Sequence, residues 1–253
     1  MPNDSSKKNS QATEVNAPGK WGAVIGVVFG LLAFLVPQFL VGFVHASLNG
    51  GASVVSDTDQ LYMYAASSLL TLLLISLLLQ RYKTNLSGFF GKFKGNYLAY
   101  ALAALPVYMV FSMFLHGLMT AVSPGYDPDQ VQNVGFATGQ DGFGLAIVFI
   151  SLVVIPPIVE EVLFRGFVFK GFQKSFHPVL AAVLTSAIFG LAHGQWNVGI
   201  DTFALSLALC YLAYKTNSLW PSVLLHSLKN LIAFILVFVI TPEQLQLLWQ
   251  QLM

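Results

Sequence analysis

Residues Phe143 to Arg165 read Phe-Gly-Leu-Ala-Ile-Val-Phe-Ile-Ser-Leu-Val-Val-Ile-Pro-Pro-Ile-Val-Glu-Glu-Val-Leu-Phe-Arg. An apolar run of about 20 residues is long enough to cross the hydrocarbon core of a bilayer as a helix. Glu160 and Glu161 interrupt this run near its end. An ionised side chain at bilayer depth costs at least about 2.5–3.5 kcal/mol on insertion scales, so the two carboxylates indicate a functional site.

The composition of the whole chain agrees with a membrane protein. Of its 253 residues, 56% are hydrophobic and 9% are charged, whereas a soluble domain carries about 25% charged residues. The net charge of +1 gives no basic surface for nucleic acid, so we expect no nucleic-acid partner. The sequence predicts an all-α, polytopic bundle of about seven transmembrane helices (six to eight), at about 21–45, 61–80, 97–122, 143–170, 178–193, 200–214 and 218–240.

We expect a disordered polar tail over residues 1–20 and a single integral-membrane domain over 21–253. Lysine and arginine residues fall before the first predicted span and in alternate loops after it, while the other loops carry only acidic charges. The positive-inside rule therefore predicts a cytoplasmic amino terminus and, with seven spans, an external carboxyl terminus.

Helical spacing predicts different roles for the two glutamates. Glu161 and Arg165 lie four residues apart, which suits an ion pair that neutralises one carboxylate in a low-dielectric interior. Glu160 then remains available for chemistry, as a general base.

Two histidines and an amide lie in other predicted spans. His226 and Asn230 are four residues apart, so they share a helix face and can point at one partner. An imidazole at His193 or His226 can polarise water, donate to an oxyanion or bind a metal, and Asn230 is a neutral donor suited to an oxyanion hole. A carboxylate, two imidazoles, an amide and water form a hydrolytic set.

These residues also form three motifs that carry a resemblance. The segment Glu160–Arg165 matches E-E-x-x-x-R, Phe189–His193 matches F-x-x-x-H, and His226–Asn230 matches H-x-x-x-N. In this order and on separate apolar helices, they resemble the motifs of the CAAX-protease and bacteriocin-processing family of intramembrane endopeptidases. The resemblance covers about residues 143–235.

The resemblance implies an endopeptidase that cleaves a membrane-associated peptide or protein at or within the bilayer. By analogy with the family, Glu160 and His193 activate the attacking water, and His226 with Asn230 stabilises the oxyanion. Two further motif residues have a supporting role: Glu161 and Arg165. The small chain with simple loops is similar to bacterial members, which implies the plasma membrane of a bacterium.

The type of protease, glutamic or metallo, stays open at this stage. The sequence lacks H-E-x-x-H, the usual zinc-protease spacing. His193, His226 and Glu160 could still hold a catalytic divalent metal such as zinc.

Two other classes of protein remain compatible with the sequence. Buried carboxylates and histidines also form the proton relays of a proton-coupled transporter, although we see no repeat of broken helices in two halves. A non-catalytic membrane immunity or scaffold protein could keep the same helices without turnover. Loss of a motif residue would favour that class, and none is lost here.

Overall fold

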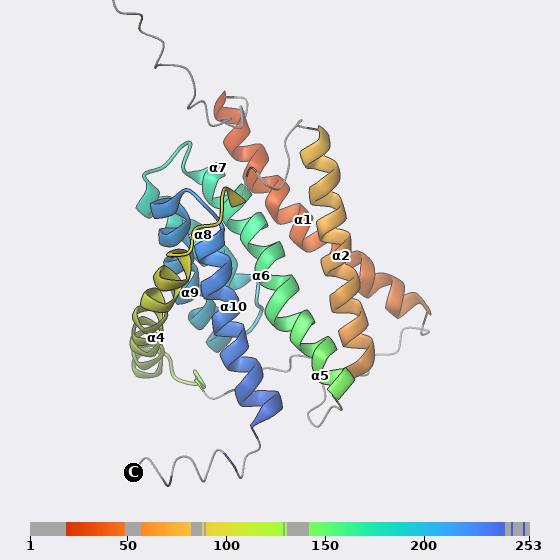
Figure 1. Cartoon of the computed structure of the whole chain (residues 1–253), viewed down its shortest axis with the longest axis vertical. Coiled ribbons are helices and arrows are strands. Elements are labelled where there is room, and N and C mark those ends of the chain that lie inside the picture. The colour runs from red at the N-terminus through yellow and green to blue at the C-terminus, as the bar shows by residue number, and fades with distance from the viewer. Residues whose placement is uncertain are drawn as a thin grey trace, which may run out of the picture.

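A computed structural model describes residues 19–48, 57–81, 88, 90–128, 130, 142–240, 244 and 250 (Figure 1). Of the expected tail, residues 1–18 lie outside this part of the chain, and the first helix begins at Gly19. The secondary-structure elements of the described part are all helices, with π-helices labelled η. In chain order they are α1 (Gly19–Leu48), α2 (Asp57–Arg81), α4 (Tyr97–Val122), α5 (Gly142–Phe149), η1 (Ile150–Val154), α6 (Ile155–Glu160), η2 (Glu161–Phe169), α7 (Lys170–Phe172), α8 (Pro178–Leu191), α9 (Trp196–Thr216), α10 (Trp220–Phe234) and η3 (Ile235–Val239).

The prediction of an all-α polytopic membrane protein is confirmed. Within the described ranges, five helices are long and apolar enough to cross a membrane, and two shorter apolar helices accompany them: Ala65–Leu77 and Pro178–Leu191. Large apolar side chains face outward, among them Phe39, Val107 and Met113, each about 70% exposed. Water does not tolerate so much exposed apolar surface on a monomer, whereas the hydrocarbon of a bilayer does.

The segment from α5 to α7 runs through the middle of the bundle as one continuous helical path (Figure 1). Helices α1 and α2 pack against one side of it, with α1 lying along η2 and α7. Helix α4 lies on the other side and packs on α9 and α10. The glutamates, at the junction of α6 and η2, therefore lie in the interior.

Two prolines explain why the central path is not a uniform α-helix. Pro156 has no N–H, so it cannot donate to the carbonyl of Leu152 four residues earlier. The chain adapts with a π-helical turn, η1, directly before the prolines, and Ile155 N–H donates to Ile150 O at its end. The helix is therefore irregular directly before the glutamates, in the form of a π-helical turn.

Small residues allow close approach where α8 crosses α9. A Cβ atom added to Gly190 would lie 2.6 Å from the carbonyl oxygen of Gly199, and one added to Gly199 would lie 3.0 Å from that of Gly190. Small residues at helix crossings are the usual means of close packing in membranes. This contact fixes the end of α8, which is followed by His193.

Candidate functional site

Glu161 is the buried centre of a charged network. Its Oε1 accepts a hydrogen bond from Arg165 Nη1 at 2.9 Å, and both side chains are fully buried. His226 Nδ1, on α10, lies 3.0 Å from the same oxygen. The predicted Glu161–Arg165 ion pair is confirmed, although η2 is π-helical rather than α-helical. Because a carboxylate only accepts, this contact fixes a proton on His226 Nδ1.

Arg165 extends the network to α9. Its Nη2 donates to Ser206 Oγ at 2.7 Å and lies 3.4 Å from the Ser206 carbonyl oxygen. The guanidinium carbon also lies 4.6 Å from the centre of the Phe189 ring, a cation–π distance. Sequence reasoning missed Ser206. The signal was Thr202 and Ser206, four residues apart on an apolar helix, which indicates a polar strip facing the bundle.

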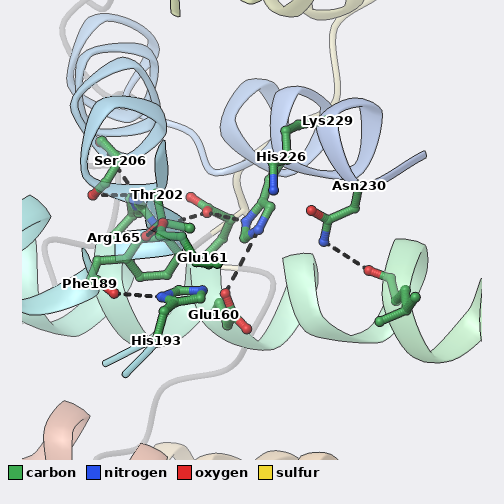
Figure 2. A network of polar contacts seen from close by, with 12 residues as sticks. Glu160, Glu161, Arg165, Phe189, His193, Thr202, Ser206, His226, Lys229 and Asn230 are labelled. Atoms are coloured by element: carbon green, nitrogen blue, oxygen red, sulfur yellow. Dashed lines mark hydrogen bonds and ion pairs between the residues drawn. The ribbon is translucent and has the colours of Figure 1, made fainter. Parts of the chain in front are cut away.

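Glu160 differs from its neighbour in both burial and contacts. Its side chain is 13% exposed, against 0% for Glu161, and its Oε2 lies 3.8 Å from His226 Nε2. That separation is too long for a hydrogen bond but close enough for a water or a substrate atom to contact both groups. The structure thus places one glutamate in a fixed ion pair and leaves the other partly accessible (Figure 2).

His193 follows the carboxyl end of α8 and turns back toward the glutamates. Its Nδ1 lies 2.7 Å from the Phe189 carbonyl oxygen. With the proton on Nδ1, this contact is a hydrogen bond that leaves the Nε2 lone pair free. Figure 2 shows the ring near Glu160 and His226, and the charge of Glu160 acts on it.

Phe189 is a buried core residue that packs against both histidines of the site. Its ring is 1% exposed and contacts the rings of His193, His226 and Phe164, with centroids 4.9, 6.0 and 4.7 Å apart. The Phe189 ring therefore packs against both imidazoles and restricts their orientation.

Asn230 has a partner that the sequence did not indicate. Its Nδ2 donates at 2.9 Å to the carbonyl oxygen of Leu152, the carbonyl that Pro156 leaves without an N–H (Figure 2). In this structure His226 and Asn230 have different partners, since His226 contacts the glutamates. The reason is the helix break, which offers Asn230 a backbone acceptor.

A second polar cluster lies next to the site, between α4, α9 and α10. Lys229 Nζ lies 3.5 Å from Asp201 Oδ2, and the other carboxylate oxygen, Oδ1, accepts from Tyr108 OH at 2.8 Å and from Ser112 Oγ at 2.7 Å. A charge pair in a bilayer is stabilised when donors satisfy its remaining oxygen, as they do here. The cluster ties the three helices together beside the H-x-x-x-N segment.

The donor set for a metal does not assemble here. Among the described residues, no group of three or more His, Cys, Asp or Glu side chains is placed to hold a metal ion. The set His193, His226 and Glu160 therefore does not fit a metal in this arrangement, and metal binding stays an untested prediction from the sequence.

Apolar helices around a buried Glu–Arg–His network define an integral membrane protein with a polar interior site, and comparison with known proteins agrees. Residues 142–232 match the family described as Type II CAAX prenyl endopeptidase Rce1-like. This range contains all three motifs, so this part of the chain is similar to that family.

One curated relative gives a similar result. The chain is similar to the candidate membrane peptidase YdiL of Bacillus subtilis (strain 168), with 24% identity over 89 residues. That match covers 35% of this chain and 36% of the relative, so it spans about a third of either protein. No solved structure matches the chain.

Proposed function

We propose that this protein is an intramembrane endopeptidase that hydrolyses a peptide bond of a membrane-associated peptide or protein. The observation that carries the proposal is the contrast between the two adjacent glutamates. Glu161 is fully buried and neutralised by Arg165, whereas Glu160 is partly accessible and has no comparable partner nearby. A carboxylate that has only a 3.8 Å contact with an imidazole, rather than a short bond to an arginine, is suited to take a proton from water.

In the proposed mechanism, Glu160 and the free Nε2 of His193 hold the attacking water, and Glu160 accepts its proton. The hydroxide oxygen bonds to the substrate carbonyl carbon, and the carbonyl oxygen becomes the oxyanion. His226 Nε2 donates to this oxyanion from a doubly protonated ring, because the proton on Nδ1 is already donated to Glu161 Oε1. Glu160 then returns its proton to the amine as the C–N bond breaks.

Asn230 contributes through the second N–H of its amide. One N–H is used by the Leu152 carbonyl, and a carboxamide has two. In this mechanism the other N–H donates to the oxyanion beside His226. No step passes through a metal, because the donors do not assemble around one in this arrangement.

We further propose that the protein resides in a bacterial plasma membrane with its amino terminus in the cytoplasm. The distribution of basic residues supports the orientation, and the Bacillus relative supports the bacterial source. A substrate held in the same membrane would reach Glu160 without having to cross that membrane.

The test is cleavage of a library of quenched, membrane-anchored peptides by the detergent-purified full-length protein. Wild type is compared with Glu160→Ala and His193→Ala, and with Lys174→Gln as a control at an exposed position away from the site. We expect cleavage by wild type and by the control, and at least about a 100-fold loss in the two site variants. No cleavage by folded wild type would favour a non-catalytic immunity or scaffold protein.

A further inference from the structure

A cavity of about 320 Å³ lies at one end of the bundle, where the end of the central path meets the turn between α9 and α10. Glu160 does not line this cavity, but Arg165 does. Arg165 Nη1 and Nη2 form hydrogen bonds with Glu161 and Ser206, whereas its Nε forms none. The polar side chains that line it are Arg165, Lys170, Gln173, Tyr214, Asn217 and Ser218.

The lining has the chemistry of an anion site. It contains two cationic side chains, Arg165 and Lys170, and none of the residues that line it is acidic. Gln173, Asn217 and Tyr214 add neutral donors. Arg165 Nε is buried and has no hydrogen-bond partner, which is a costly state for a charged group and indicates a missing acceptor. A volume of this size is at the lower end of the range for small ligands.

The position of the cavity points to a lipid as the source of the anion. It lies where two of the membrane-crossing helices end, at Phe172 and at Thr216. Tyr211 and Tyr214 are about 60% exposed at this end of α9, and Lys174 and Lys215 are exposed close by in the sequence. Tyrosines and lysines at the ends of spans mark the headgroup layer of a bilayer.

We propose that this cavity binds the phosphate of an anionic membrane lipid, with Lys170 and Gln173 as the ligands that can be tested separately. Basic pockets between transmembrane helices on the cytoplasmic side are known to hold anionic headgroups. The bound phosphate also lies one side chain away from Glu161, through Arg165. The inference does not depend on the proposed peptidase activity, because binding is measured without cleavage.

The experiment follows thermal unfolding of the full-length protein in a neutral detergent by tryptophan fluorescence. Phosphatidylglycerol, phosphatidylcholine and inorganic phosphate are titrated at one ionic strength. The variants are Lys170→Gln and Gln173→Glu, which places a carboxylate in the lining, with Lys174→Gln as the matched control outside the cavity. Gln173 is only partly buried, so its variant carries the test if Lys170→Gln does not fold.

We expect phosphatidylglycerol to raise the unfolding midpoint of wild type and of Lys174→Gln, while phosphatidylcholine leaves it unchanged. The apparent affinity for phosphatidylglycerol should fall at least about five-fold in each cavity variant. An equal rise with inorganic phosphate that is lost in the cavity variants supports the site and assigns it to free phosphate. Equal responses to the two lipids, or a full response in both cavity variants, would overturn the proposal.

Discussion

Substitution of the two adjacent glutamates should separate stability from activity. Glu161→Gln should mainly lower stability, and Glu160→Gln should mainly lower the rate of cleavage. Glu161→Gln leaves the fully buried Arg165 guanidinium without its counter-ion. Removing one partner of a buried pair costs about 3–5 kcal/mol, which lowers the unfolding midpoint by on the order of ten degrees for a chain of this size. Glu160→Gln removes only a partly exposed contact at 3.8 Å, so its stability should change by less than about 1 kcal/mol.

For cleavage, the larger direct effect is expected from the Glu160 variant. Glu160→Gln keeps the size of the side chain and removes the base, so turnover should fall by about 10²–10⁴-fold in a protein that is as stable as wild type. Glu161→Gln should lose activity only to the extent that it unfolds or releases His226.

Stability can be followed with a thiol-reactive fluorophore, because Cys210 is the one cysteine of the chain and is fully buried until the protein unfolds. Cleavage is measured on the same preparations below their unfolding midpoints. Equal losses of stability in the two variants, or a Glu160→Gln protein that still turns over, would refute the distinction between the two carboxylates.

Three further predictions concern the scaffold and the site. Asn230→Ala should lower the free energy of unfolding by about 1–3 kcal/mol, because it leaves the Leu152 carbonyl without a donor. Adding Pro156→Ala should restore much of that stability by supplying a backbone N–H. Thermal unfolding of the single and double variants tests this, and no recovery in the double variant would disprove the role of Asn230 as the donor to Leu152. Gly190→Ala should destabilise by about 1–3 kcal/mol and reduce cleavage, since its methyl would meet the Gly199 carbonyl at 2.6 Å; unchanged unfolding and kinetics would contradict the close crossing. Cleavage should survive a chelator, because the described donors do not assemble around a metal; loss of activity that zinc restores would show a metal enzyme instead.

The parts of this account that depend on local spacing or hydropathy were predictable from the sequence. Apolar runs predicted the spans, since a bilayer demands about 20 such residues per helix. The four-residue spacing predicted the pairing of Glu161 with Arg165, because neighbours at that spacing share a helix face. The expected span at 200–214 is longer in the structure, as α9 covers Trp196–Thr216. The predicted orientation in the membrane stays a prediction.

The parts that depend on how helices rotate against one another were not predictable. Ser206 and Asp201 lie on α9, but one binds Arg165 and the other binds Lys229, and nothing in the local sequence says which residue of another helix each will meet. The partner of Asn230 depends on the π-helical turn that exposes the Leu152 carbonyl 78 positions earlier in the chain. A pattern along one helix cannot encode such contacts, since they follow from tertiary packing.

In the proposed mechanism Glu160 activates a water molecule and does not attack the substrate itself. A single turnover in H₂¹⁸O, with enzyme in excess over a membrane-anchored peptide, tests it directly by mass spectrometry. We expect ¹⁸O in the new carboxyl group of the product in that first turnover, and none in Glu160. Unlabelled product together with ¹⁸O in the Glu160 carboxylate would show a covalent acyl-enzyme instead of direct attack by water.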